Sequence, residues 1–252
     1  MTKPWIRLPR ALLSGFFFFF YGIFALPFAL LLPVLPRRTG RWIVRVFYRL
    51  FVLLSRVTGL YAVRLSSPPT LHPPPPQTPK HPNTQTPPPP PPPPPGRIVV
   101  MNHVSLIDIC VLLAHLPDAV CIAKASTKLN PFLAMEVRKL FIANDKGGAA
   151  TIAEAKAHLD RGIHVVVFPQ GTRGGAKFHR GAARLALATG AAIEAWHIAY
   201  DPVVLAKGQP WWDVGDKIIR IALAHRGTIR PEGPNDHRTA VALTARIAAA
   251  IA

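Results

Sequence analysis

Residues 98–116 read IVVMNHVSLIDICVLLAHL, and this stretch decides the fold. Its first four residues are apolar and predict a buried β-strand, and residues 105–116 predict an amphipathic helix directly after it. The alternation continues to the end of the chain, with strands predicted at 120–123, 163–168, 193–199 and 217–222 and helices predicted at 149–159, 180–188 and 238–251. Such regular alternation predicts an α/β fold in which helices flank a mixed, mostly parallel sheet.

The positive charge lies mainly in the first quarter of the chain, which is also its most apolar part. The 252 residues include 30 Lys and Arg against 12 Asp and Glu, a formal net charge of +18, and residues 1–64 hold ten of these cations and no acidic residue. A basic, apolar segment is typical of contact with a membrane surface, whereas a nucleic-acid binder would carry its cations among polar residues on the folded domain. We therefore expect membrane lipids, and not nucleic acid, as partners.

The uncharged run at residues 11–35 has basic residues on both sides. As one straight helix it would be about 38 Å long, enough to cross a hydrocarbon core of roughly 30 Å. Pro27 and Pro33 interrupt its second half, and the equal flanks give the positive-inside rule no orientation. A bent hairpin in one leaflet fits these features better than a single span. A membrane-associated helical hairpin is therefore predicted within residues 1–66, at the cytoplasmic face of the inner (plasma) membrane.

Four arginines in residues 41–63 fall on one side of a predicted helix. Arg41, Arg45, Arg49 and Arg56 span an arc of roughly 80° at about 100° per residue, and apolar residues cover the rest. This pattern is typical of an interfacial helix whose arginines reach lipid phosphates. A second buried or spanning helix is the alternative.

Proline dominates the segment at residues 67–96. Seventeen of the 28 residues from Pro68 to Pro95 are proline, and the last nine are consecutive. A segment with so few backbone donors cannot join a sheet, so it is predicted to be an extended linker, with a ligand for a polyproline-binding module as the alternative. The predicted organisation is an anchor at 1–66, a linker at 67–96 and a catalytic domain at 97–252.

Asn102, His103 and Asp108 follow the first predicted strand of this domain, at the edge of the sheet where reactive groups gather. Five positions along one helix would turn Asp108 about 140° away from His103. The two side chains therefore meet only if His103 stands on the turn and Asp108 lies in the first helical turn, for which Ser105 is the predicted N-cap. A histidine held by a carboxylate can act as a general base on a hydroxyl, and a purely structural histidine is the alternative.

A second motif, Phe168-Pro169-Gln170-Gly171-Thr172-Arg173-Gly174-Gly175, follows the predicted strand that ends near residue 168. Its proline and glycines predict a turn with outward-pointing amides, to which Thr172 and Arg173 add a hydroxyl and a forked cation. We interpret this turn as a cradle for an anion, with a plain surface turn as the alternative. The chain contains no His-Glu-x-x-His and no paired Cys-x-x-Cys motif, so no metal and no cofactor are expected.

In this order and spacing, the two motifs resemble those of the glycerolipid acyltransferases with an HxxxxD motif, in particular the bacterial 1-acyl-glycerol-3-phosphate acyltransferases. The resemblance runs from about residue 98 to the end and implies a glycerol-3-phosphate acyltransferase-like fold. It implies that His103 activates the acceptor hydroxyl, that Asp108 orients His103, and that the Gly171 turn binds the acceptor phosphate. The implied reaction transfers an acyl chain from acyl-CoA or acyl-carrier protein to lysophosphatidic acid and makes phosphatidic acid for phospholipid biosynthesis.

Two positions depart from the pattern of the family. Gln170 stands where glutamate is usual, and Asn144 stands where the second motif has an arginine. Lys146 is the candidate for the missing cation, with Arg138 and Lys139 as alternatives. The predicted substrate-binding residues are Asn102, Lys146, Gln170, Gly171, Thr172 and Arg173. The departures leave open an acyltransferase for another lysolipid, such as a lysophospholipid or a lyso-ornithine lipid, and a non-catalytic membrane adaptor is the remaining alternative.

Overall fold

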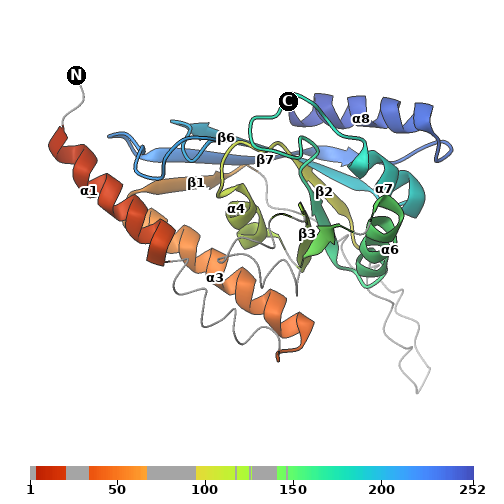
Figure 1. Ribbon diagram of the computed structural model, residues 1–252, viewed down its shortest axis with the longest axis horizontal. Helices are drawn as coiled ribbons and strands as arrows, with labels where there is room; N and C mark the ends of the chain where they lie inside the picture. The colour runs from red at the N-terminus through yellow and green to blue at the C-terminus, as the bar shows by residue number, and fades with distance from the viewer. Residues whose placement is uncertain are drawn as a thin grey trace, which may run out of the picture.

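A seven-stranded sheet forms the centre of the computed structural model, which describes residues 4–20, 34–66, 95–116, 118–124, 126, 141–145 and 147–252 (Figure 1). Its strands are β1 Tyr61–Leu65, β2 Ile98–Met101, β3 Ala119–Lys124, β4 Ile142–Asn144, β5 His164–Val167, β6 Ile193–Asp201 and β7 Ile219–Ile229. The order across the sheet is β1-β7-β6-β2-β5-β3-β4. The strands from β6 to β4 run parallel, β7 is antiparallel to β6, and β1 pairs with β7 in parallel. The predicted mixed, mostly parallel sheet is confirmed.

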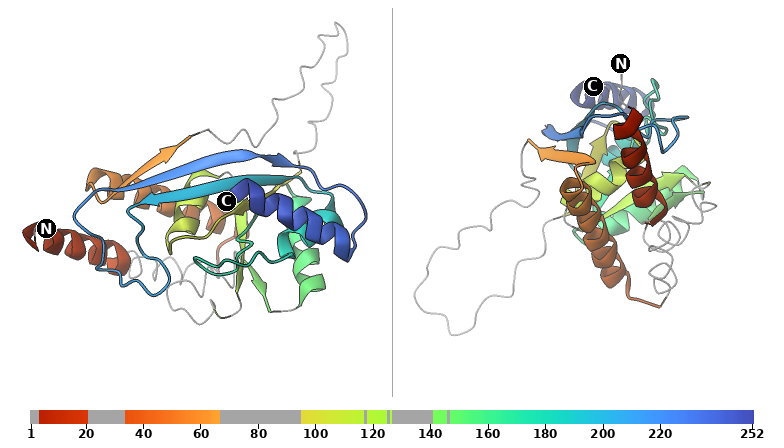
Figure 2. Two further views of the ribbon diagram at one scale, coloured as in Figure 1. Left: turned by 90° about the horizontal axis from the view of Figure 1, so that it is seen from above. Right: turned by 90° about the vertical axis from the view of Figure 1, so that its left-hand side faces the viewer.

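Helices cover both faces of this sheet. The helices on one face are α3 Arg37–Val57 and α4 Asp108–His115, and those on the other are α6 Gly148–Leu159, α7 Gly181–Thr189 and α8 His237–Ile251. Figure 2 shows α8 over one face of the sheet and α3 over the other. Both faces of β2 and β5 are therefore buried, which explains why these strands are continuous apolar runs rather than alternating ones.

The predicted elements of residues 97–252 recur with small shifts in their ends, but two strands were not predicted. β4 has only three residues, and β1 lies in the segment that the sequence assigned to the anchor. β7 also extends well past the predicted end at residue 222, because pairing with β6 continues to Ile229. The second half of β7 contains polar residues, which is why the apolar pattern ended too early.

The helix after β2 begins later than predicted. α4 starts at Asp108 with Ile107 as its N-cap residue, so the prediction of Ser105 as the N-cap is wrong. The Asp108 carboxylate instead reaches back and accepts hydrogen bonds from the amides of Val104 and Ser105, at 2.6 and 2.9 Å. A side chain inside the helix therefore fixes the turn that precedes it.

The N-terminal part contains α1 Pro4–Gly15, which continues as the π-helix η1 Phe16–Phe20, and α3. Residues 21–33, which would join these helices into the predicted hairpin, lie outside the described residues. Among the helices of the described ranges, none combines the length and the apolar character that crossing a bilayer requires. The membrane hairpin stays a prediction.

The sequence predicted that the arginines of α3 all face outward, but two of them bond to the rest of the protein. The Arg41 guanidinium pairs with the Asp118 carboxylate, and Nε of Arg49 donates to the Ala114 carbonyl at 3.0 Å. The Arg41 side chain is 11% exposed and ion-paired, so the prediction that it reaches lipid is wrong. Arg49 is exposed and bonds to the protein only through Nε, so for this residue the lipid contact stays a prediction. Large apolar side chains are also exposed on α3, namely Trp42, Val46, Leu50, Leu53 and Val57.

The predicted domain boundaries are only partly visible. Residues 67–94, which make up the predicted linker except for Pro95 and Gly96, lie outside the described part of the chain. β1 pairs with β7 over its whole length, from Tyr61 opposite Ile219 to Leu65 opposite Leu223. The division into three domains stays a prediction, but residues 61–65 belong to the sheet.

Candidate active site

His103 and Asp108 meet at the carboxyl end of β2, as their spacing predicted. Nδ1 of His103 lies 2.8 Å from Oδ2 of Asp108. A carboxylate only accepts hydrogen bonds, so Nδ1 carries the proton and the lone pair lies on Nε2. The Asp108 side chain is 0% exposed and that of His103 is 20% exposed, which leaves the imidazole open to a substrate while its partner is shielded.

Asp108 is held by neutral donors. Oδ2 accepts from the two amides of the preceding turn, and Oδ1 accepts from the Tyr200 hydroxyl at 2.6 Å. Burial raises the pKa of Tyr200 well above its ordinary value, and the Asp108 charge raises it further, so the phenol remains a donor. A buried carboxylate needs such donors because its charge is poorly solvated.

Tyr200 was missed in the sequence, although it lies near the carboxyl end of β6, where reactive groups of such sheets gather. It stands 92 positions from Asp108, so no local spacing connects the two. Its place one residue past the predicted end of the strand at 193–199 is the one signal that could have found it.

The His103 turn is joined to the second motif by its main chain. The amide of His103 donates to Oε1 of Gln170 at 2.6 Å, and the His103 carbonyl accepts from the Gly174 amide at 2.8 Å. Nε2 of Gln170 in turn donates to the Gly175 carbonyl at 2.7 Å. Gln170 therefore bridges the two motifs as donor and acceptor at once, a pairing that a glutamate could not make.

Phe168 packs against one face of the His103 imidazole. Its ring stacks on that of His103 with centroids 4.4 Å apart and planes 27° apart. The same motif that bridges to the main chain of His103 thus also restricts its side chain.

Asn102 has both ends of its amide bonded inside the fold. Nδ2 donates to the Ile198 carbonyl at 2.8 Å, and Oδ1 accepts from the Ile198 amide at 2.7 Å. The side chain therefore ties the end of β2 to β6. Substrate binding by Asn102 and by Gln170 stays a prediction, because both side chains already hold the turn in place.

The predicted anion cradle is a turn next to His103. Gly171 adopts φ 64°, a left-handed conformation that favours glycine, and its amide donates to Phe168 at 2.9 Å. The amides of Thr172 and Arg173 donate to no residue in the described ranges, so they are available to an anion. Nη1 of Arg173 donates to the Leu205 carbonyl at 2.7 Å, which anchors the guanidinium beside this turn.

The remaining predicted cation lies outside the described residues. This applies to Lys146 and equally to the alternatives Arg138 and Lys139. Asn144, at the end of β4, accepts a 3.4 Å hydrogen bond from the Thr151 hydroxyl with its side-chain oxygen. Position 144 therefore serves the contact between β4 and α6.

Cys121 is a poor nucleophile. Burial raises the pKa of its thiol to about 12, so the thiolate is not formed near neutral pH. Cys110 is half-buried on α4. The His103 and Asp108 pair is the better candidate for the chemistry.

Comparison with known proteins links this geometry to one family. The family model described as "Acyltransferase" matches residues 89–203. A 1-acyl-sn-glycerol-3-phosphate acyltransferase of Helicobacter pylori strain J99 is 38% identical over 90 residues, which cover 32% of this chain and 38% of that protein. The match thus spans little more than a third of the length of this relative.

A solved structure has a similar fold. It is the crystal structure of the 1-acyl-sn-glycerophosphate (LPA) acyltransferase PlsC from Thermotoga maritima, with a TM-score of 0.65 and 21% sequence identity. The superposition covers 96% of this chain and 94% of that chain, so the likeness includes the N-terminal part as well as the sheet.

Proposed function

We propose that the protein transfers an acyl chain from a thioester to the free hydroxyl of 1-acyl-glycerol-3-phosphate. The match of residues 89–203 to the acyltransferase family model supports this reaction class. The donor is acyl-CoA or acyl-carrier protein, and the product is phosphatidic acid. The observation that carries the proposal is the 2.8 Å contact between His103 and a fully buried Asp108, directly beside a turn with free amides.

In the proposed reaction, Nε2 of His103 takes the proton of the acceptor hydroxyl while the oxygen attacks the thioester carbonyl. The carbon–sulfur bond then breaks, and the departing thiolate takes the proton back from the imidazolium. Asp108 stabilises the imidazolium because it is a buried anion at hydrogen-bond distance. General base catalysis of this kind contributes roughly 10²- to 10⁴-fold to the rate.

The proposed acceptor site lies in the turn at Gly171. The free amides of Thr172 and Arg173 and the remaining donors of the Arg173 guanidinium would bind the phosphate. Gly174 connects this turn to the His103 carbonyl, so phosphate and base are held at a fixed relative position. Lys146 is proposed as a further cation.

We further propose that the enzyme works at the cytoplasmic face of the inner membrane. Large apolar side chains are exposed on α1, η1 and α3: Leu8 and Leu12 on α1, Phe16 and Phe19 on η1, and Trp42, Val46, Leu50, Leu53 and Val57 on α3. An exposed apolar surface of this extent is typical of contact with lipid. Acceptor and product are themselves lipids, so this surface would bring the base to the membrane plane.

A second acceptor class is favoured by Gln170 and Asn144. Neither side chain carries charge, and both are bonded inside the fold. A lysolipid with another head group, such as lyso-ornithine lipid, would retain the His103 chemistry and make less use of phosphate contacts.

The test is an acyl-transfer assay with purified full-length protein on a panel of lysolipids, with acyl-CoA and acyl-carrier protein supplied in parallel. We expect wild-type activity on lysophosphatidic acid and its loss in His103→Ala and Asp108→Ala. The matched control is His115→Ala, which removes an imidazole from the last residue of α4, the helix that begins at Asp108. Equal transfer by wild type and both site variants would refute the catalytic assignment, and activity on phosphate-free lysolipids alone would refute the acceptor.

A further inference from the structure

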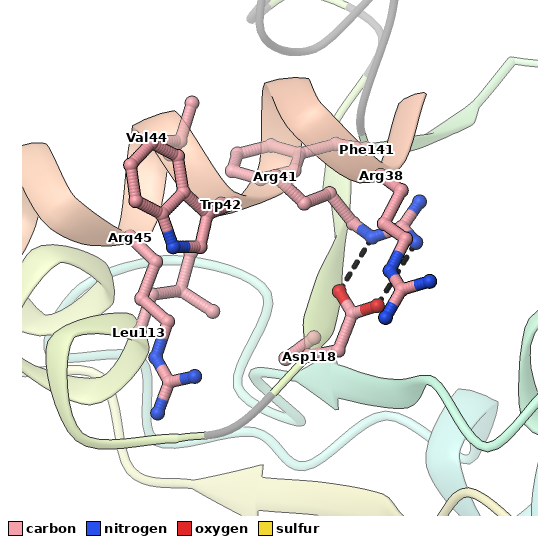
Figure 3. A pocket seen from close by; sticks show the side chains of 9 residues that line it. Arg38, Arg41, Trp42, Val44, Arg45, Leu113, Asp118 and Phe141 are labelled. Carbon is pink, nitrogen blue, oxygen red and sulfur yellow. Dashed lines mark hydrogen bonds and ion pairs between the residues drawn. The ribbon is translucent and has the colours of Figure 1, made fainter. Parts of the chain in front are cut away.

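A cavity of about 180 Å³ lies at the other end of α4 from the site described above. It is bounded by the N-terminal half of α3, the last turn of α4 and the start of β3, and its lining includes Arg38, Arg41, Arg45, Trp42, Leu113 and Asp118 (Figure 3). We call it the arginine pocket.

The arginine pocket is separate from the proposed acceptor site. Asp108 is the first residue of α4, whereas Leu113 lies in its last turn, and Asp118 directly precedes β3 while His103 follows the carboxyl end of β2. At about 1.5 Å per residue, Asp108 and Leu113 are about 7.5 Å apart along α4. The pocket and His103 therefore lie at opposite ends of this helix, and the pocket is not the phosphate site proposed for the acyl acceptor.

The pocket has an excess of positive charge. Asp118 is the one carboxylate in its lining, and Arg41 engages it through two nitrogens, at 2.5 and 2.9 Å. Among the described residues, no ion pair joins Arg38 or Arg45 to a carboxylate. In Figure 3 the Arg45 guanidinium points away from Asp118, past Leu113.

Arg45 has a buried side-chain nitrogen without an acceptor in the described residues. Its Nε is buried and forms no hydrogen bond with any residue in the described ranges. Burial lowers the pKa of the Arg45 guanidinium, and the neighbouring charge of Arg49 lowers it further. A bound anion would relieve both effects, because it would supply an acceptor and an opposite charge.

The surroundings of the pocket are apolar on the exposed side. Trp42 lines the pocket and is also the first member of the exposed apolar row of α3 that continues through Val46 and Leu50. A ligand with a charged head at the arginines would therefore extend its apolar part along this row. An amphiphilic anion fits both features, whereas a small soluble anion uses only the first.

We propose that the arginine pocket binds the phosphate group of an anionic membrane phospholipid, at a site distinct from the acyl acceptor. The proposal rests on the membrane location proposed above. It assigns the lipid contact of α3 to Arg38 and Arg45, since Arg41 and Arg49 are bound to the protein. A phospholipid held there would fix the depth and the tilt of α3 relative to the bilayer.

The test measures binding of the full-length protein to vesicles of phosphatidylcholine with and without phosphatidylglycerol. We expect Arg38→Gln and Arg45→Gln each to weaken binding to the anionic vesicles by roughly tenfold, because each removes a cation that lines the pocket next to the lipid phosphate. The matched control is Arg56→Gln, which removes the same charge from an exposed position of the same helix and should weaken binding by about twofold.

Equal weakening by all three variants would overturn the proposal, because the contact would then be diffuse surface charge. Equal weakening on purely zwitterionic vesicles would overturn it as well, and so would release of the protein from anionic vesicles by millimolar coenzyme A, which would make a soluble phosphate the occupant. Vesicle binding needs no acyl donor. Whether the proposed acyl transfer occurs is determined separately, by the activity assay on the wild-type protein.

Discussion

In the described part of the chain, two buried carboxylates each contact a histidine, and their surroundings differ in a way that favours one of them as a catalytic pair. Asp108 lies 2.8 Å from His103, and Glu194 at the start of β6 lies 2.6 Å from His225. Their side chains are 0% and 1% exposed, so burial does not distinguish them.

The other donors make the difference. Glu194 also binds Arg97 and accepts from the Thr228 hydroxyl at 2.9 Å, so a permanent cation already compensates its charge. Burial alone would raise the pKa of Glu194, but the hydrogen bonds from Arg97, Thr228 and His225 outweigh it and lower the pKa. Asp108 has only neutral donors besides its imidazole, so a proton arriving on His103 gains the full stabilisation of the carboxylate.

A contact between histidine and carboxylate is therefore not by itself a sign of catalysis. The pair near Glu194 joins β6 to β7 and to Arg97, which directly precedes β2, whereas the pair near Asp108 stands at a strand end with an accessible imidazole. Removing corresponding groups from each pair should separate activity from stability.

The largest contrast is expected from the two imidazoles. His103→Ala should lower the acyl-transfer rate by about 10²- to 10⁴-fold, because it removes the base, and should leave thermal stability nearly unchanged. His225→Ala should retain the rate within roughly twofold at temperatures where it is folded. Initial rates and melting curves of both variants measure this, and a comparable loss of rate in His225→Ala would break the comparison.

The next contrast concerns the carboxylates. Glu194→Gln should lower the free energy of unfolding by about 2–3 kcal/mol, less than the roughly 3–5 kcal/mol of a fully buried pair because Arg97 is partly exposed. Asp108→Asn should abolish most of the activity, since a neutral amide does not stabilise the imidazolium. Urea unfolding and initial rates are the measurements, and a stable Glu194→Gln with low activity would contradict the structural role.

A smaller effect is expected from the hydroxyls. Tyr200→Phe removes one donor from Asp108 and should lower kcat roughly tenfold with little change in KM, because Tyr200 contacts Asp108 and would act through it. Thr228→Val removes the corresponding donor from Glu194 and should leave kcat unchanged. Steady-state kinetics decide the matter, and a change confined to KM would assign Tyr200 to substrate binding instead.

The smallest expected effect is a dependence on pH. Because the pKa of Glu194 is lowered in the folded protein, its contribution to stability is present above the unfolded value of about 4.3 and is lost as pH falls through the folded value. The difference in unfolding free energy between wild type and Glu194→Gln should therefore shrink below about pH 4. Urea titrations between neutral and acid pH measure it, and a constant difference would show that the charge of Glu194 is irrelevant.

The sequence was sufficient for features that depend on neighbouring positions. The continuous apolar runs predicted β2 and β5, and the separation of five positions predicted how His103 and Asp108 meet across the start of α4. The expected resemblance to the acyltransferases agrees with the family model that matches residues 89–203, the part of the chain that holds both motifs.

Features that depend on distant positions could not be predicted. Tyr200 and Asp108 are 92 positions apart, and Arg41 and Asp118 are 77 apart. The helical periodicity of α3 correctly placed its arginines on one arc, but it contains no information about which side the rest of the protein would cover. β1 was missed for the same reason, since β7, its partner, comes at the other end of the chain.

Gln170 determines what can be exchanged between proteins of this kind. Its side chain bonds to the His103 amide and to the Gly175 carbonyl, so the shape of each motif depends on the other. A chimaera that takes the Gly171 turn from another protein without the matching His103 turn should displace His103. The smallest portable unit for redesigning lipid selectivity is therefore the pair of loops together.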